Sequence, residues 1–151
     1  MAKVGNLTTG GKLDGSLELG QRVDGANSLQ SCESLFKGKK SVIFTVPGAF
    51  TPTCSEKHLP GFVKLHDELK AAGAEVIACI SVNDPFVMNA WGKDQEVGDK
   101  VLMLADGNGK WSEAAGTLVD KGAHMGMRCN RFAMILDKEM TIEWIAEGFP
   151  Q

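Results

Sequence analysis

The sequence has few cysteines, and none of them lie in a C-x-x-C pair. Cys32, Cys54, Cys79 and Cys129 stand far apart in a chain of 151 residues. This spacing excludes a zinc ribbon and the usual dithiol redox motif. The chain is also too long and too poor in cysteine for a disulfide-stapled secreted miniprotein. We therefore expect a reducing compartment, in which a cysteine is by default a small buried side chain.

Strong net charge, long apolar runs and targeting signals are also missing. The 16 Lys and Arg against 19 Asp and Glu leave a formal net charge of −3, which gives no basic footprint for nucleic acid. No apolar run approaches the roughly 18 residues of a membrane-spanning helix, and residues 1–11 lack the apolar core of a signal peptide. We expect a cytoplasmic protein that binds neither nucleic acid nor membrane, although a transit peptide already removed would be invisible.

The pattern of apolar residues predicts one α/β domain over residues 1–151. β-Branched and apolar runs predict strands over 41–46, 75–82, 100–105, 131–136 and 141–146. Helical spacing and capping residues predict helices over 28–36, 53–72, 85–91 and 111–118. The polar, Gly-rich segment 1–25 is interpreted as a loop that leaves room for a hairpin.

The order of these elements favours a central sheet with helices on both faces. The closing hairpin, which turns at residues 137–139, makes that sheet mixed and indicates a thioredoxin-like fold. Sites in such sheets lie beyond the carboxyl ends of the strands. Cys54 follows the strand 41–46 and opens the next predicted helix. It is therefore the cysteine best placed for chemistry.

The position of Cys54 also favours a reactive thiolate. A free cysteine has a pKa near ~8.5, and a helix N-terminus lowers it through unpaired N–H groups and a partial positive charge. Thr51 offers a hydroxyl three residues earlier, Pro47 and Pro52 stiffen the loop, and Phe50 adds an apolar wall. Such a pocket suits attack on a small O–O bond, although an ordinary strand-to-helix loop is the alternative.

The residues around Cys54 resemble a known family. The sequence PGAFTPTC at 47–54 resembles the P-x-x-x-T-x-x-C motif of peroxiredoxins. The stretches VPGAFTPTCSEKHLPGF at 46–62 and CISVNDPFV at 79–87 resemble its type II, or peroxiredoxin 5-like, subfamily. The likeness extends from about residue 35 to 145. One departure is Thr45, where the subfamily commonly has Gly.

The resemblance implies a role for five residues. Cys54 would be the peroxidatic cysteine, which attacks the peroxide and becomes a sulfenic acid. Thr51 would bind the thiolate and a peroxide oxygen through its hydroxyl, and Pro47 would shield the site. Arg131 would be the catalytic arginine, and Arg128 matches a second arginine of the subfamily. The family requires no metal or cofactor, and the histidines form no metal-ligand spacing with the cysteines.

The thiol that resolves the sulfenic acid is left open by the sequence. Cys79 has the spacing of the second cysteine in plant-like relatives but lies in a buried strand, so a disulfide with Cys54 would need local unfolding. Cys129 stands in a segment, Arg128 to Arg131, where the subfamily usually has Ser. If that segment is extended, residues 129 and 131 face the same side, so Cys129 is a second candidate for the resolving thiol. The simplest hypothesis is a one-Cys route in which glutathione with glutaredoxin, or thioredoxin, supplies the reducing thiol.

Two classes of function follow from the same cysteine. The first is a thiol peroxidase that reduces hydrogen peroxide and organic hydroperoxides. The second is a non-enzymatic peroxide sensor or a chaperone-like redox binding protein that uses Cys54. The resemblance further implies a homodimer formed through the loops near the active site. Residues 149–151 end the chain where the family usually continues into another helix.

Overall fold

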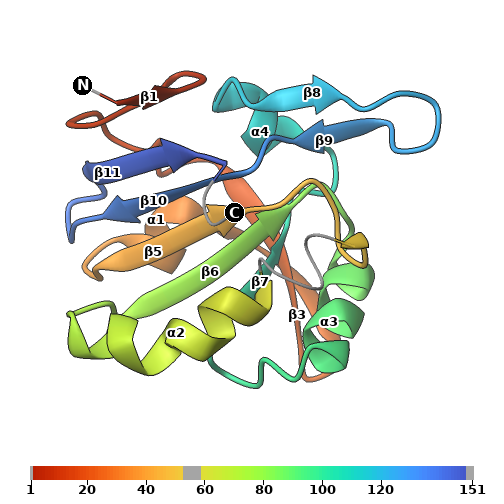
Figure 1. The fold of residues 1–151 in the computed structure, drawn as a ribbon, viewed down its shortest axis with the longest axis horizontal. Coiled ribbons are helices and arrows are strands. Elements are labelled where there is room, and N and C mark those ends of the chain that lie inside the picture. The colour runs from red at the N-terminus through yellow and green to blue at the C-terminus, as the bar shows by residue number, and fades with distance from the viewer. Residues whose placement is uncertain (1, 53–58, 149–151) are drawn as a thin grey trace.

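A computed structural model of the protein describes residues 2–52 and 59–148. These residues form a seven-stranded sheet, seen across the middle of Figure 1. Its strands are β3 (Glu18–Val23), β4 (Ala26–Ser31), β5 (Ser41–Thr45), β6 (Val76–Ser81), β7 (Leu102–Ala105), β10 (Phe132–Leu136) and β11 (Ile142–Glu147). Their order is β11-β10-β5-β6-β7-β3-β4. The central strands β5, β6 and β7 are parallel and the other pairs are antiparallel, which confirms the predicted mixed sheet.

Shorter elements complete the described part of the chain. Two small hairpins are formed by β1 (Lys3–Val4) with β2 (Leu7–Thr8) and by β8 (Leu118–Asp120) with β9 (Met127–Cys129). The helices are α1 (Cys32–Phe36), α2 (Leu59–Ala71), α3 (Pro85–Asp94) and α4 (Lys110–Ala114). None of these helices is long and apolar enough to cross a membrane.

The sheet is buried on both faces by separate apolar clusters. One cluster joins the sheet to α1, α4 and the N-terminal hairpin and includes Phe36 and Trp111. The other joins it to α2 and α3, where Phe62 stacks on Phe44 of β5 with 3.9 Å between ring centroids. In Figure 1, α2 lies in front of the sheet and α1 behind it. The run of fully buried residues in β5 fits a strand covered on both faces.

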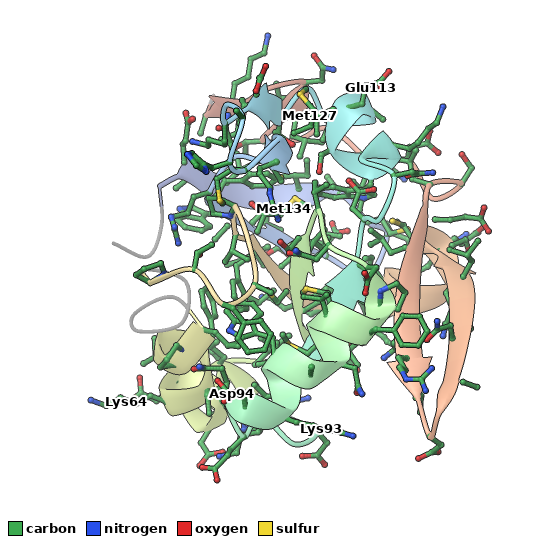
Figure 2. The ribbon with its side chains drawn as sticks, turned by 90° about the vertical axis from the view of Figure 1, so that its right-hand side faces the viewer. Lys64, Lys93, Asp94, Glu113, Met127 and Met134 are labelled. Atoms are coloured by element: carbon green, nitrogen blue, oxygen red, sulfur yellow. The ribbon has the colours of Figure 1, made fainter. Side chains whose placement is uncertain are left out.

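Charged side chains of α2 and α3 face the solvent. Figure 2 shows Lys64 on α2 and the pair Lys93 and Asp94 at the end of α3 pointing away from the molecule. Met134 of β10 lies in its interior and is fully buried. The charged side chains of α2 and α3 therefore form the solvent face over the second cluster.

The predicted helix over 28–36 was wrong in its first half. Residues 28–31 belong to β4, and α1 begins only at Cys32, where the Ser31 hydroxyl accepts a hydrogen bond from Ser34 N at 3.1 Å. Asp24 and Gly25 have φ values of 51° and 80°, as a two-residue hairpin turn requires. This turn pairs β3 with β4 and makes the N-terminal segment a hairpin.

The predicted helix over 111–118 was also too long. It ends at Ala114, and Gly116 takes a φ of 71°, which stops a helix. Leu118 then begins β8, an element that the sequence pattern did not predict. The predicted start of α3 is confirmed, because Asp84 Oδ1 accepts a hydrogen bond from Val87 N at 2.8 Å and Pro85 opens the helix.

Candidate active site

The segment that follows β5 leads to the predicted nucleophile. Cys54 itself lies outside the described residues, as does the rest of 53–58. The described part of the motif runs from Pro47 to Pro52, at the carboxyl end of β5, as predicted for a site in this fold. Pro47 is half-buried in this segment. The described part of the site consists of the residues that precede Cys54 in the sequence and of the side chains that contact them.

The segment 48–51 is a tight turn closed by its own side chain. The Thr51 hydroxyl donates a hydrogen bond to the Gly48 carbonyl at 2.7 Å. A Cβ at Gly48 would lie 3.0 Å from Cγ2 of Thr51 and 3.2 Å from Nη1 of Arg128, so the backbone is closely packed there. Phe50 takes a φ of 63° and exposes 52% of its side chain. This left-handed conformation costs a non-glycine residue on the order of 1 kcal/mol.

The turn is attached to the end of β6 through one side chain. Asn83 Oδ1 accepts a hydrogen bond from Ala49 N at 3.0 Å and a second from the hydroxyl of Ser81 at 2.6 Å. Ser81 is the last residue of β6 and is fully buried. In Figure 1 the loop after β5 accordingly passes over the end of β6 toward α3. Sequence reasoning had assigned Asn83 only to the start of that helix.

Arg131 lies at the same end of the sheet. Phe132 pairs with Thr45 across β10 and β5, which places Arg131 beside Val46, directly before Pro47. The Thr45 hydroxyl donates to Asn130 O at 2.6 Å and accepts from Phe132 N at 3.1 Å. Thr45 therefore holds the backbone on both sides of Arg131. The sequence had singled out Thr45 only as a departure from the family pattern.

Arg128 connects three backbone segments. Its Nε donates to Met125 O at 2.7 Å and its Nη1 donates to Val82 O at 3.1 Å. The same nitrogen lies against Gly48, as described above. Arg128 therefore supports the turn from the side of β9, and both of these bonds go to backbone carbonyls.

The other three cysteines are fully buried. Cys79 lies in β6 within the cluster under α2 and α3, whereas Cys32 and Cys129 lie in the cluster on the opposite face. The sulfur of Cys129 is 3.4 Å from the Thr117 hydroxyl. Burial raises the pKa of the Cys129 thiol above its usual value and that of Cys32 to about 12. Cys32 and Cys129 are therefore protonated, unreactive thiols at neutral pH.

Within residues 2–52 and 59–148, no group of three or more His, Cys, Asp or Glu side chains is arranged to hold a metal ion. The arrangement that remains is a constrained turn with a fixed hydroxyl, a neighbouring arginine and a helix that follows. An arginine in such a place suits a reaction that develops negative charge at a nucleophile and at a leaving oxygen, and the hydroxyl oxygen can orient a substrate O–H.

Comparison with known proteins finds related sequences over most of the chain. The family model described as Redoxin matches residues 13–151. The chain is 46% identical over 136 residues to chloroplastic peroxiredoxin-2E of Arabidopsis thaliana, and these cover 87% of this chain and 58% of that relative. It is 51% identical over 120 residues to peroxiredoxin-2B of the same plant, covering 78% of this chain and 74% of that relative.

Solved structures show the same similarity in three dimensions. A crystal structure of reduced Prx3 from Vibrio vulnificus in complex with hydrogen peroxide superposes with a TM-score of 0.90 at 42% identity. The superposition covers 96% of this chain and 90% of that one. Peroxiredoxin 5 from Alvinella pompejana gives a TM-score of 0.83 at 33% identity, over 95% of this chain and 90% of that one. The predicted thioredoxin-like fold is confirmed.

Proposed function

We infer the activity of this chain from the family to which it belongs, the type II peroxiredoxins. Members of this family are thiol-dependent peroxidases. We propose that this chain reduces hydrogen peroxide and organic hydroperoxides through a sulfenic acid on Cys54. The observation that carries the proposal is that the closed turn with the Thr51 hydroxyl follows β5 directly, at the end of the sheet where the register of β10 with β5 also places Arg131. The similar Vibrio vulnificus protein, solved with hydrogen peroxide, supports the choice of substrate.

The chemical step is a displacement at oxygen. The Cys54 thiolate attacks one oxygen of the peroxide, an S–O bond forms and the O–O bond breaks. The sulfur is oxidised to a sulfenic acid, and the leaving oxygen takes the electron pair of the broken bond and a proton. The products are Cys54–S–OH and water or an alcohol. Negative charge moves from sulfur to the leaving oxygen, so fixed donors around both atoms lower the barrier.

Two described side chains are suited to this charge shift. The guanidinium of Arg131 would stabilise the thiolate and bind the peroxide, because it is a permanent cation with several donors. The Thr51 hydroxyl already donates its hydrogen to Gly48 O, so its oxygen is available to accept a hydrogen bond from the peroxide O–H. Pro47, half-buried at the entry to the turn, would shield the site from water.

The sulfenic acid is proposed to be reduced by an external thiol. Attack by that thiol forms a mixed disulfide on Cys54 and releases water, and a second thiol then restores the Cys54 thiol. Full burial of both Cys79 and Cys129 supports this one-Cys route. Glutathione with glutaredoxin, or thioredoxin, would supply the reducing equivalents. A disulfide from Cys54 to Cys79 is the alternative and would require local unfolding of β6.

Peroxide turnover tests this function. Consumption of hydrogen peroxide is measured with a glutathione–glutaredoxin system and with a thioredoxin system, for the wild type and Cys54→Ser. The wild type should turn over many times and Cys54→Ser should not. A double variant Cys79→Ser/Cys129→Ser should keep most of the activity. Oxidation of one equivalent without turnover would indicate the sensor instead, and loss of turnover in the folded double variant would reject the one-Cys route.

A homodimer through the loops near the site is part of the proposal. Phe50 in the turn and Phe86 in the first turn of α3 expose 52% and 59% of their side chains. The hydrogen bond from Ala49 N to Asn83 Oδ1 brings these two segments together. The Phe86 ring packs against the Arg22 guanidinium, 4.7 Å from its centroid, whereas Phe50 offers a large apolar side chain in the turn itself, of the kind that is enriched at protein interfaces. Sedimentation velocity at micromolar concentration should give twice the mass of the chain.

The cytoplasm is the proposed compartment. The three described cysteines are free thiols, as is usual in a reducing environment. Two of the relatives are named as chloroplastic proteins, and the chloroplast stroma is the alternative. Imaging of a fluorescent fusion of the full-length protein in its own cell would decide between the two.

A further inference from the structure

We propose that Asn83 is a positioning residue, which fixes the turn 48–51 and through it the hydroxyl of Thr51. This inference rests on the proposed peroxidase function. Asn83 does not touch the reacting atoms in this account. It acts by holding the backbone of the turn at the carboxyl end of β6, between the two parallel strands that lead into the site.

The Asn83 amide is held in one orientation by its two partners. Its Oδ1 receives two donors, Ala49 N at 3.0 Å and the Ser81 hydroxyl at 2.6 Å. Because both partners are donors, they define which end of the amide is oxygen and hold the side chain in one orientation. Ser81 is fully buried at the end of β6. The Asn83 Oδ1 atom that accepts from Ala49 N is therefore held in place by a buried residue of the sheet.

The conformation of the turn also depends on Asn83. Phe50 adopts a φ of 63°, although it is not glycine and about half of it is exposed. A strained residue of this kind persists only where the surrounding structure holds it. Thr51 is held from within the turn by the Gly48 carbonyl, and Ala49 is held from outside the turn by Asn83. Loss of the Asn83 bond would let Phe50 relax and move the adjacent Thr51.

Arg128, the other support of the turn, does not replace Asn83. Its Nη1 lies against Gly48 and donates to Val82 O, and its Nε donates to Met125 O. It packs beside the turn and does not accept from Ala49 N. Asn83 is the side chain that receives that N–H.

The test compares two adjacent substitutions. Asn83→Ala removes the acceptor for Ala49 N, whereas Asp84→Ala removes the N-cap of α3, whose bond goes to Val87 N. The second-order rate of reaction of reduced protein with hydrogen peroxide should fall about tenfold in Asn83→Ala, as expected when a reacting group is displaced. Asp84→Ala should react at the wild-type rate, although it weakens α3, the helix that begins directly after it. Equal losses in the two variants would overturn the proposal.

A double-mutant cycle isolates the path from Ser81 to the turn. Ser81→Ala should lower the same rate by a smaller factor than Asn83→Ala. The double variant should be no slower than Asn83→Ala alone, because both substitutions act through one acceptor. Multiplied losses in the double variant would contradict this coupling. If Asn83→Ala yields no folded protein, Ser81→Ala decides the question, and a wild-type rate in that variant overturns the proposal.

A second readout separates this proposal from the peroxidase function. Alkylation of Cys54 by iodoacetamide across pH reports its thiolate without any peroxide. Asn83→Ala should change the rate of alkylation, because the turn that precedes Cys54 in the sequence is no longer held in place, and Asp84→Ala should leave that rate unchanged. If the wild-type protein does not react with peroxide, the proposed function is wrong. The alkylation profiles of the variants would still test whether Asn83 positions the turn. An unchanged profile together with an unchanged peroxide rate in Asn83→Ala would reject the positioning role.

Discussion

The hydroxyl of Thr51 has one hydrogen, and the turn uses it for the Gly48 carbonyl at 2.7 Å. The oxygen is thereby oriented with its lone pairs available, so Thr51 acts as an acceptor for the peroxide O–H. Thr51→Val keeps the shape of the side chain but removes this acceptor and the bond that closes the turn. We expect the rate of reaction with hydrogen peroxide to fall about 100-fold, measured by stopped flow.

Thr51→Ser is the matched control for this prediction. It retains the hydroxyl and the bond to the Gly48 carbonyl, and loses only the methyl group that packs on Gly48. Its rate should stay close to that of the wild type. Equal rates in the Val and wild-type proteins would show that the hydroxyl takes no part in binding peroxide.

At the residue scale, a sequence indicates some candidates more readily than others. The roles of Thr51 and Arg131 stay predictions, and they follow from the resemblance of a contiguous motif and a short spacing to a family pattern. Asn83 and Thr45 act through backbone groups far away in the chain, at Ala49 and Asn130. No local pattern indicates such partners, because they depend on the register of neighbouring strands. These two residues could be found only in the folded structure.

Among the elements, α4 depends on a single buried carboxylate. Asp106 is 2% exposed and accepts three hydrogen bonds, from Trp111 N, Ser112 N and the Ser112 hydroxyl, at 3.0, 2.8 and 2.7 Å. These bonds satisfy donors in the first turn of the helix. Asp106→Ala should lower the free energy of unfolding by about 2 kcal/mol, because those donors would be left buried and unpaired. Urea unfolding followed by circular dichroism measures this loss.

Asp84 provides the comparison at an exposed helix start. It caps α3 with one bond, from Val87 N, and its side chain is exposed. Asp84→Ala should cost about 1 kcal/mol, because water can replace the lost acceptor. A smaller loss for the Asp106 variant than for the Asp84 variant would show that α4 is fixed by its packing rather than by this carboxylate.

The elements that were predicted well each carry a strong signal within their own residues. β5 and β6 are apolar runs buried on both faces, and α3 begins with a strong capping residue. β4 was interpreted as helix because Leu29, Cys32, Leu35 and Phe36 have helical spacing. It is an edge strand with polar residues on both faces, so it lacks the alternation that identifies strands. β8 and β9 are too short to show any period.

For the whole molecule, the buried thiols make stability depend on pH. Burial raises the pKa of Cys32 to about 12 and raises that of Cys129 as well. In the unfolded chain a thiol loses its proton near pH ~8.5. Above that pH the unfolded state binds fewer protons than the folded state, so stability falls as pH rises. Below it, both states are protonated and these thiols add no pH dependence.

Cys32→Ala should therefore reduce the alkaline loss of stability. Between pH ~9 and ~11 the wild type should lose up to about 1.4 kcal/mol per pH unit more than the variant. Between pH 6 and 8 the two proteins should show the same slope, even though the variant is less stable throughout. Urea unfolding at a series of pH values provides the slopes. Identical slopes at high pH would mean that Cys32 is not protonated in the folded protein.

The most direct test of the account concerns which sulfur reacts. The reduced protein is treated with one equivalent of hydrogen peroxide and dimedone, and each cysteine is then read by mass spectrometry. The account predicts a dimedone adduct on Cys54, with Cys32, Cys79 and Cys129 recovered as free thiols after unfolding, because burial keeps those three from the peroxide. An adduct on any of the three buried cysteines, with Cys54 unmodified, would contradict it.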